Sequence, residues 1–458
     1  MTALLAALLL AQNILGGGSV NGASVQSATT AALTFYVDPA GNNANTCTAS
    51  GAGGACATLA GVLPKIPQII NHNVTVNIAA GAYAAPFILS TPITISNGAT
   101  LTFTGAQTTF TPATGTSSGT TTAAAAGSTS GPATITDSGQ SWTTSDLVGR
   151  YVLFGSGALS GQAFPITANT GTVITIPMTT SPGVGSTYTI VDNTSTFISA
   201  TAASIVNISG DGALALTNLW IERTSGATMT NSATVRVNST NVSVRSASVA
   251  WLQAGGLAYP ARSYFSGVTG YSTQTSSTVA ATLPVVRATN CSFKGTTSPG
   301  VQLGAGSSLD LLSGSTVEAT TGSALSVVTA SNATATNLWA SCSSTGTGIT
   351  VGSAMGVSGA RASSFAGTSG SFRISGCTTG VLVYGYSYAH LAAPTLANLT
   401  TGISVLRGGV YDLNNDGITF STVTNELSYD GTNVTLAALD ALAAPKIFTN
   451  NYGSRLIR

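Results

Sequence analysis

Charge is what this sequence has least of. The 458 residues include 14 Lys and Arg and 13 Asp and Glu, so 6 % of the chain is charged, where about 25 % is usual in soluble domains. The net charge is +1, and the basic residues are scattered along the chain. A scattered, sparse set of cations argues against the basic surface on which nucleic-acid binding depends. We therefore predict no nucleic-acid partner.

Strong helix formers are also scarce. The chain has little Glu, Lys or Gln and only 4 Met, whereas Gly reaches 53 and Thr, Ser, Ala and Asn supply most of the polar surface. Val, Ile, Leu and aromatic residues recur along the whole chain, which argues against disorder. Uncharged β-branched residues favour strands, and Gly and Asn favour tight turns. The composition predicts an all-β protein.

Groups that could carry catalysis are few. The two histidines, His72 and His390, lie far apart in the sequence, and no P-loop, dinucleotide-binding or nucleophile motif is present. Between residues 197 and 409 the acids are Asp211, Glu222, Asp310 and Glu318. Cleavage of a sugar chain by acid–base or nucleophilic chemistry needs paired carboxylates. No catalytic residue and no cofactor are therefore predicted, although a carboxylate pair formed between subunits stays open.

The five cysteines divide into two groups. Cys47 and Cys56 bracket a Gly-rich segment, so they form either a local disulfide or two separate thiols. Cys291, Cys342 and Cys377 lie in strand-like runs, and we expect them to fill the core as small apolar side chains. Their spacing does not match a zinc site.

The N-terminal segment "MTALLAALLLAQNILGGG" is the one helix-like part of the chain. Its apolar run is too short for a comfortable membrane span. Leu4, Leu8, Ala11 and Leu15 have the spacing of a short coiled-coil seam. This predicts an anchoring or oligomerisation helix over residues 1–15. The alternative is the apolar region of a signal peptide, although no Lys or Arg precedes it.

An internal repeat is the strongest pattern in the sequence. The dipeptide Thr-Asn recurs with its asparagine at Asn218, Asn241, Asn290 and Asn337, at intervals of 23, 49 and 47 residues. Glycines at 300, 322, 346 and 370 step by 22, 24 and 24 residues. These independent markers agree on a unit of about 23–24 residues, which is a period typical of solenoid proteins.

The content of each unit selects the kind of solenoid. Leucine-rich repeats share this period, but their consensus is missing and no helical stretch separates the strands. Each unit instead holds short strands broken by Gly, Ser or Asn, as one turn of three short sheets requires. We predict a right-handed parallel β-helix in which the four asparagines share one corner, stacked about 4.8 Å apart.

The first strands carry a resemblance to a known family. A strand ending in Tyr-Val-Asp-Pro, a Gly/Asn loop, a short helix near residues 59–66 and then "VTVNIAAGAY" resemble the opening of pectate-lyase-like β-helix proteins of the bacteriophage tailspike and fibre type. This detailed resemblance covers residues 33–110, and the rest is similar in period and composition. It implies a homotrimer that is attached to a virion tail or head protein through its N-terminal segment.

The repeat is interrupted once and ends before the C-terminus. Residues 115–192 break the period, and we expect five short strands there in a protruding barrel that buries little area against the coils. The turns at Asp416-Gly417 and Asp430-Gly431 predict hairpins in a C-terminal cap. The predicted divisions are an anchoring segment at 1–30, the start of the β-helix at 31–113, the inserted domain at 114–195, the shaft at 196–409 and the cap at 410–458.

Two surfaces are candidate binding sites. Strand alternation in "VLVYGYSYAH" predicts that Tyr384, Tyr386, Tyr388 and His390 share one outward face. Tyrosine suits either sugar stacking or a trimer interface, and both interpretations stay open. Trp220, beside Glu222 and Arg223, is a second candidate.

One segment resembles half of a calcium loop. Asp412, Asn414 and Asp416 alternate before a glycine, but Val423 stands where an EF-hand has its bidentate glutamate. A turn closed by Asp-Gly explains the same residues without metal, and we favour that interpretation.

Together these features and the resemblance predict an extracellular phage virion protein. We expect a trimeric spike or fibre that attaches to host surface polysaccharide without efficient cleavage. A glycan depolymerase with an intersubunit active site and a secreted bacterial β-helix adhesin are the alternatives.

Overall fold

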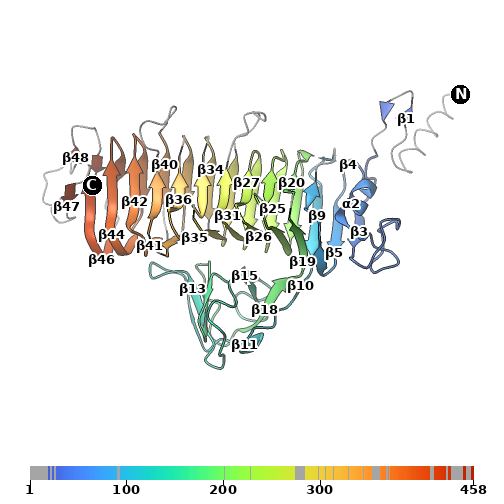
Figure 1. Cartoon of the computed structure of the whole chain (residues 1–458), viewed down its shortest axis with the longest axis horizontal. Helices are drawn as coiled ribbons and strands as arrows, with labels where there is room; N and C mark the ends of the chain where they lie inside the picture. Colours follow the sequence, from blue (N-terminus) through green and yellow to red (C-terminus); the bar gives the residue numbers. More distant parts are fainter. Residues whose placement is uncertain are drawn as a thin grey trace.

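The structure, a computed structural model, is an elongated parallel β-solenoid of about 14 turns, with 54 % of the chain in strands and 2 % in helices (Figure 1). The predicted all-β parallel β-helix is confirmed. The described residues are 19–20, 23–24, 27–89, 93–200, 202–226, 228–273, 284–297, 299–304, 306–312, 314–328, 330–343, 345–352, 362–367, 370, 372–412, 417–429, 432–434, 447–449 and 455–457. The helix expected over residues 1–15 lies outside them.

Three strands per turn build the shaft, which we define as the solenoid outside residues 107–193. Sheet 1 contains β3 (Leu33–Val37), β5 (Val74–Ile78), β9 (Thr100–Gly105), β22 (Ala213–Thr217), β25 (Arg236–Thr240), β28 (Leu257–Ala261), β31 (Val285–Thr289), β34 (Ser308–Leu312), β37 (Asn332–Ala335), β40 (Ser364–Gly367), β43 (Tyr388–Leu391), β45 (Val410–Asp412), β48 (Ile447–Thr449) and β49 (Arg455–Ile457). Sheet 2 contains β6 (Gly81–Tyr83), β19 (Ser195–Ser199), β23 (Leu219–Arg223), β26 (Ser243–Ser246), β29 (Tyr264–Gly267), β32 (Ser292–Gly295), β35 (Ser315–Ala319), β38 (Leu338–Cys342) and β41 (Phe372–Ser375).

The third side of the shaft is formed in the same way. Sheet 3 contains β7 (Ile88–Leu89), β20 (Ser204–Val206), β24 (Met229–Asn231), β27 (Val249–Gln253), β30 (Thr269–Thr273), β33 (Val301–Leu303), β36 (Ser323–Val327), β39 (Thr347–Val351) and β42 (Thr379–Tyr384). The long strands β44 (Thr395–Leu406) and β46 (Thr419–Tyr429) extend across sheets 2 and 3 and join them. The shorter strands are β1 (Ser19–Val20), β2 (Ala23–Ser24), β4 (Ile69–Ile70), β8 (Thr94–Ile95), β21 (Ser209–Gly210) and β47 (Thr432–Val434).

Alternation along each strand separates the core from the surface. In β5 the side chains of Val74, Val76 and Ile78 are buried, while Thr75 and Asn77 between them face outward. Parallel pairing puts equivalent residues of successive turns side by side, so one buried column follows the whole shaft. The outward positions of the shaft strands are occupied by Thr, Ser, Asn and a few aromatic and charged residues.

The repeated asparagines occupy one corner, as the sequence predicted. Asn218, Asn241 and Asn290 each follow a strand of sheet 1 and have φ of 55°, 54° and 52°, the left-handed region that asparagine tolerates better than most residues. The Nδ2 of Asn241 donates to Oδ1 of Asn218 at 3.3 Å. Asn337 follows β37 at the equivalent position. Arg262, with φ of 48°, takes this corner in the turn between Asn241 and Asn290.

A short helix and a disulfide lie at the N-terminal end of the shaft. Helix α2 (Leu59–Val62) continues into the 3-10 turn η1 (Leu63–Lys65), in the region where the sequence predicted a capping helix. Thr58 caps α2, because its hydroxyl accepts from the Gly61 N–H at 3.1 Å. Nearby, Cys47 and Cys56 are joined as a disulfide.

A second disulfide corrects the expectation that Cys342 and Cys377 are separate core thiols. Their Cα atoms lie 4.8 Å apart and their sulfur atoms are bonded, although 35 residues separate them. The solenoid turn that leads from β38 to β41 is longer than the average repeat. A constant period of 24 residues therefore does not place Cys342 beside Cys377. Cys291 is buried and free.

Residues 107–193 form a lobe beside the shaft (Figure 1). The lobe has nine strands in two antiparallel sheets, rather than the five expected. They are β10 (Gln107–Thr109), β11 (Ser118–Thr120), β12 (Ala123–Ala125), β13 (Ala133–Thr136), β14 (Tyr151–Phe154), β15 (Ala163–Pro165), β16 (Ala168–Asn169), β17 (Val173–Ile176) and β18 (Thr187–Asn193). An apolar cluster of its own fills the space between the sheets.

The lobe is docked on sheet 2, so the expectation of little contact is wrong. The hydroxyl of Tyr151 lies 3.1 Å from that of Ser243 in the shaft, and both residues are fully buried. At the far end of the lobe, Trp339 Nε1 donates to the carbonyl of Ser128 at 2.8 Å. The sequence could not show this because the contacting residues are up to 244 positions apart.

The C-terminal part partly matches the predicted cap. Strands β46 and β47 pair antiparallel on either side of Asp430 and Gly431, which themselves lie outside the described residues. No hairpin forms at Gly417, since β45 pairs with β43 while β46 pairs with β44. The solenoid therefore continues past residue 409. Among the described residues, no helix has the length and hydropathy of a membrane span.

Candidate functional site

A groove lies where the lobe meets sheet 2. It has a volume of about 250 Å³ and is lined by Ser130, Pro132 and Thr167 from the lobe and by Glu318, Ser341 and Arg373 from the shaft, among others. The shaft residues come from the neighbouring strands β35, β38 and β41, whose parallel pairing brings their outward positions side by side. The groove thus combines a carboxylate, a guanidinium and several hydroxyl groups.

The groove offers a single carboxylate. Glu318 is the one acid among its described lining residues, and its Oε1 lies 3.2 Å from Nζ of Lys294 on β32. Trp339 also lines the groove, but only 4 % of its surface is exposed, and its indole N–H donates to the lobe at Ser128. Arg373 Nη1 donates to the carbonyl of Thr129 at 3.4 Å. These contacts make the groove better suited to binding than to acid–base catalysis, which needs a second proton-transfer group.

Three of the shaft acids, Glu222, Asp310 and Glu318, lie opposite basic residues in the ladders rather than opposite each other. In the parallel ladders Glu222 lies opposite Arg245, and Glu318 lies opposite Lys294. Asp310 lies opposite Arg287, but its Oδ1 accepts a 2.8 Å hydrogen bond from Thr334 on the other side. Asp310 and Glu318 lie on sheets 1 and 2, so they cannot act as a pair within one chain. The sequence revealed the missing acid pairs but not the cations opposite them.

Trp220 lies beneath the lobe rather than on an open face. Its indole N–H donates to Oε2 of Glu222 at 2.9 Å, and the Cζ of Arg245 lies 4.1 Å from its ring centroid. Arg150 of the lobe lies at 5.2 Å from the same ring and pairs with Asp192 at 3.1 Å. Arg223, which the sequence analysis placed beside Trp220 in this candidate site, lies on the same strand and contributes to none of these contacts. Trp220 therefore joins lobe and shaft.

Burial at this junction changes the ionisation of its charged groups. It lowers the pKa of the Arg245 guanidinium, because the charged form loses water. It also raises the pKa of the Asp192 carboxyl, and the nearby Arg150 opposes this shift only in part. Arg245 of the shaft donates to the carbonyl of Gly149 in the lobe at 3.4 Å, and Asp192 holds Arg150 beside Trp220, so the junction is a structural feature of the molecule.

The tyrosines near residue 386 point outward, but from two sheets. Tyr384 ends β42 in sheet 3, while Tyr388 and His390 lie on β43 in sheet 1. Tyr386 forms the corner between them, with φ of 58° and 67 % of its surface exposed. The expectation of a single face is wrong because the strand ends at this corner. The inward positions are buried as predicted, since Val383 and Ala389 are fully covered.

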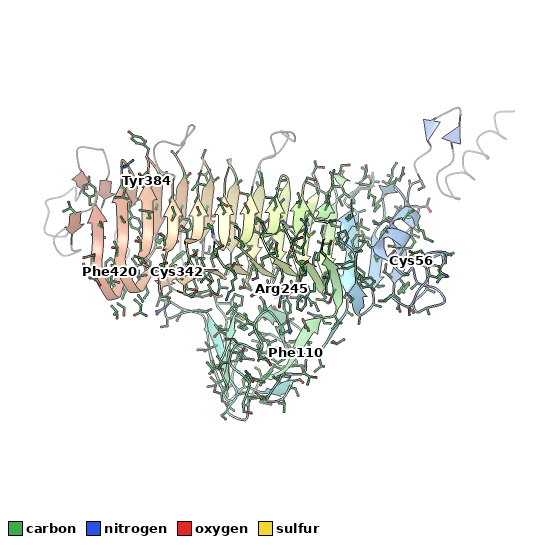
Figure 2. The ribbon with its side chains drawn as sticks, in the orientation of Figure 1. Cys56, Phe110, Arg245, Cys342, Tyr384 and Phe420 are labelled. Atoms are coloured by element: carbon green, nitrogen blue, oxygen red, sulfur yellow. A yellow bond between two sulfur atoms is a disulfide. The ribbon has the colours of Figure 1, made fainter. Side chains whose placement is uncertain are left out.

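Polar contacts hold part of this tyrosine corner, by which we mean Tyr384, Tyr386, Tyr388 and His390. The hydroxyl of Tyr388 donates to Oδ2 of Asp412 at 3.0 Å, and His390 Nδ1 lies 3.2 Å from the backbone carbonyl of the same residue. The Cζ of Arg407 lies 5.6 Å from the ring centroid of Tyr384. Figure 2 shows Tyr384 projecting from the edge of the shaft. Tyr386 is the most exposed aromatic ring of the described residues.

The calcium-loop candidate gains no support. Asp412 is engaged by Tyr388, whereas Asn414 and Asp416 lie outside the described residues. Within the described part of the chain, no group of three or more His, Cys, Asp or Glu could hold a metal ion.

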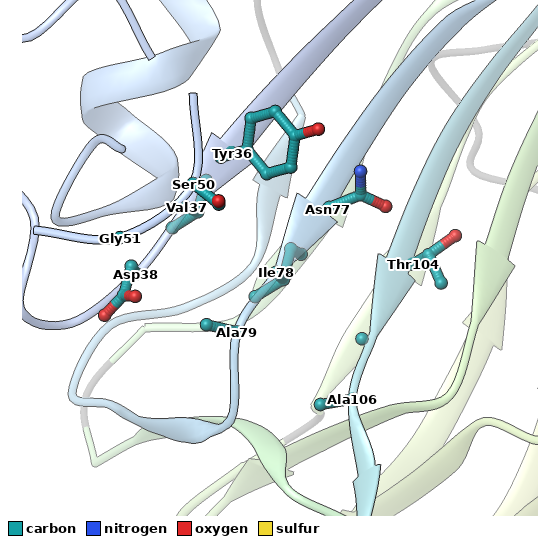
Figure 3. Close-up of a pocket in the computed structure, with 11 residues that line it drawn as sticks. Tyr36, Val37, Asp38, Ser50, Gly51, Asn77, Ile78, Ala79, Thr104 and Ala106 are labelled. Atoms are coloured by element: carbon teal, nitrogen blue, oxygen red, sulfur yellow. The ribbon is translucent and has the colours of Figure 1, made fainter. Parts of the chain in front are cut away.

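A further hollow, which sequence reasoning missed, lies on sheet 1 near the N-terminal end of the shaft. It has a volume of about 240 Å³, and its lining includes Tyr36, Asn77 and Thr104. These three residues are direct partners on β3, β5 and β9, and their side chains point to the same side (Figure 3). An aromatic ring followed by an amide and a hydroxyl group is a surface that suits a sugar chain.

Comparisons with known proteins find similarity only among solved structures. No protein-family model and no curated protein sequence matches this chain. The tailspike protein gp49 from Pseudomonas phage LKA1 is 9 % identical, with 88 % of this chain and 67 % of that chain covered and a TM-score of 0.23. A glycoside hydrolase is 9 % identical, with 90 % and 99 % covered and a TM-score of 0.28.

A third similar structure is the Gp54 tailspike of Acinetobacter baumannii bacteriophage AP22 in complex with A. baumannii capsular saccharide. It is 10 % identical, with 77 % of this chain and 71 % of that chain covered and a TM-score of 0.18. All three TM-scores are too low to indicate a close structural match. The assignment of the solenoid therefore depends on the strand pairing of this chain itself.

Proposed function

We propose that this chain forms the shaft of a trimeric phage tailspike or fibre that binds host surface glycans without cleaving them efficiently. The observation that carries this proposal is the separation of the shaft acids. Glu318 on sheet 2 is paired with Lys294, whereas Asp310 lies on sheet 1 and accepts a hydrogen bond from Thr334 of the same sheet. Sugar cleavage by two carboxylates needs both of them at one bond.

Binding, in contrast, needs only the surface that the fold provides. The outer positions of sheet 1 present hydroxyl, amide and aromatic groups at the strand spacing of about 4.8 Å, with Tyr36, Asn77 and Thr104 as one such row. The tyrosine corner adds exposed rings at the other end of the shaft. Three chains in one spike would multiply weak contacts of this kind into useful avidity.

Adsorption tests the binding half of the proposal. The purified full chain is incubated with a panel of bacterial strains, and the bound fraction is measured before and after the surface polysaccharide is removed. We expect adsorption to particular strains that is lost with their polysaccharide. Replacing Tyr384, Tyr386 and Tyr388 with alanine should weaken adsorption or trimer assembly, and size-exclusion chromatography with light scattering separates these effects. Adsorption that persists on stripped cells would contradict glycan binding.

Two alternatives predict different results. A depolymerase is favoured by one observation, the presence of Glu318 and Arg373 in the same groove, and it predicts release of soluble oligosaccharide. A secreted bacterial adhesin predicts that the protein is found on cells rather than on particles. Immunogold labelling of purified virions distinguishes the phage protein from the adhesin.

A further inference from the structure

Sheet 1 carries a small cationic patch in the middle of the shaft. Arg236 on β25, Tyr259 on β28 and Arg287 on β31 come from three successive turns, and we call them the arginine patch. Both arginines are exposed, and Tyr259 between them is half-buried. In strands β22, β25, β28 and β31 these two arginines are the only charged residues.

The tyrosine ring brings the two cations together. The Cζ of Arg236 lies 5.8 Å from the ring centroid of Tyr259, and the Cζ of Arg287 lies 5.9 Å from it. An aromatic ring attracts a guanidinium group within about 6 Å, so Tyr259 offsets the repulsion between two like charges. The two arginines are two strands apart, and Arg236 is level with Val285, two residues before Arg287. Their backbones are therefore about 12 Å apart, a span comparable to a disaccharide.

Neither guanidinium group is neutralised by the described part of the protein. Neither Arg236 nor Arg287 forms an ion pair or hydrogen bond with a described residue, and the ion pairs Arg150–Asp192 and Lys294–Glu318 involve other cations. Asp310 lies opposite Arg287 in the ladder, but its carboxylate accepts a hydrogen bond from Thr334 instead. Next to the patch, Leu257 leaves 37 % of its surface exposed. Two available guanidinium groups thus lie beside exposed aromatic and apolar surface.

We infer that the arginine patch binds an anionic saccharide through its carboxylate groups. Guanidinium matches a planar carboxylate with two parallel N–H···O hydrogen bonds, and the apolar face of a sugar ring can cover Leu257 and the edge of Tyr259. A neutral saccharide would leave both cations without a partner. This inference rests on the proposed glycan-binding function and assigns the class of glycan: an acidic polysaccharide, such as one that contains uronic acid.

Calorimetric titration of the full chain tests the inference with two matched probes. Tetragalacturonate carries a carboxylate on every sugar, and its methyl ester has the same rings without the charge. We expect the acid to bind more tightly than the ester, with a difference that shrinks as salt is added. Arg236→Gln and Arg287→Gln should each weaken binding of the acid about threefold, which is the loss expected for one solvent-exposed ion pair.

Control variants separate this site from a general effect of charge. Arg223→Gln removes the same charge from sheet 2 and should leave the titration unchanged. Arg287→Lys keeps the charge without the planar fork and should bind less well than wild type. Tyr259→Phe keeps the ring between the cations and should behave as wild type, whereas Tyr259→Ala should weaken binding of the acid.

Three results would overturn the inference, and an adsorption measurement then decides whether the proposed function also fails. Equal binding of acid and ester, no binding of the acid, or equal losses in Arg287→Gln and Arg223→Gln would reject the arginine patch as the site. If the chain still adsorbs to host polysaccharide, the proposed function stands without it. If polysaccharide-dependent adsorption also fails, both are wrong.

Discussion

The Nζ atom of Lys294 lies 3.2 Å from Oε1 of Glu318, across two neighbouring turns of the solenoid. Glu318 is the one carboxylate among the described residues that line the groove between lobe and shaft. Lys294 engages one oxygen of this carboxylate, and no second acid lines the groove to act as its proton-transfer partner. This relationship links the charge pattern of the shaft to the proposal that it binds glycans without cleaving them.

The Lys294–Glu318 pair should contribute little to stability, because 30 % of each side chain is exposed to solvent. We expect Lys294→Met to lower the free energy of unfolding by about 1 kcal/mol or less, as for other exposed pairs. Arg150→Met is the matched comparison, since it leaves Asp192 in a more buried site and should cost about 3 kcal/mol. Equilibrium denaturation measures both, and a larger loss for Lys294→Met would contradict this view of the pair.

The lobe should be removable from the shaft. The amide of Thr194 donates to the carbonyl of Ala106 at 3.0 Å, so the chain leaves the shaft and returns at adjacent points. Joining Ala106 directly to Thr194 should leave the sheet signal of the solenoid in circular dichroism. Because deletion of the lobe exposes Trp220 and Trp339 to solvent, the variant should bind a hydrophobic dye and self-associate more readily than wild type. Loss of the sheet signal would show that the shaft depends on the lobe.

The asparagine corner should be sensitive to substitution because of its backbone conformation. Asn241 has φ of 54°, which costs an ordinary residue about 1–2 kcal/mol. We expect Asn241→Ala to lower the free energy of unfolding by about this amount, and Asn241→Gly to cost less. Asn238→Ala, three residues earlier within strand β25, is the control and should have a smaller effect. Equal losses for Asn241→Ala and Asn238→Ala in equilibrium unfolding would argue against a conformational role.

Features of the fold and of the candidate site were predictable where they depend on residues close together in the sequence. The period and the shared corner of Asn218 and Asn241 follow from residues about one turn apart, where local spacing gives the register. The alternation in the tyrosine corner was predictable for the same reason. Strand β42 ends at Tyr384 because Gly385 and Tyr386 both have a left-handed backbone, with φ of 62° and 58°. Gly385 is one of 53 glycines, and a left-handed tyrosine has no sequence signal, so the sequence could not show that the strand ends here.

Features that join distant residues were missed. Cys342 and Cys377 are 35 residues apart, so a constant period misplaces them. The turns that carry Arg236, Tyr259 and Arg287 also differ in length, with ladder partners 21 residues apart at Thr240 and Ala261 but 28 apart at Ala261 and Thr289. Only the strand pairing reveals that these side chains are neighbours.

Stability of the lobe should depend on pH through Asp137. Burial raises the pKa of this carboxyl, but hydrogen bonds from Tyr188, Gly139, Gln140 and Thr120 outweigh burial, and the net pKa is lowered. A lowered pKa in the folded state stabilises the protein above the ordinary aspartate value of about 4, and this contribution is lost as pH falls through the folded pKa. Asp137→Asn should therefore destabilise the lobe at pH 7 and have less effect near pH 3.

Thermal unfolding of wild type and Asp137→Asn between pH 3 and 7 measures that contribution. The difference between the two proteins is the relevant quantity, because the raised pKa of Asp192 has the opposite effect in both. A difference that does not change with pH would contradict the assigned role of Asp137.

The central claim, binding without efficient cleavage, is tested most directly by measuring soluble oligosaccharide. Wild-type protein is incubated with polysaccharide from a strain to which it adsorbs, and mass spectrometry of the filtrate detects released fragments. Glu318→Gln and a triple variant with Glu222→Gln, Asp310→Asn and Glu318→Gln are treated in parallel. We predict no fragments above the protein-free control and nearly unchanged adsorption for all three proteins. Fragments released by wild type and abolished by Glu318→Gln would contradict the account and identify the groove as an active site.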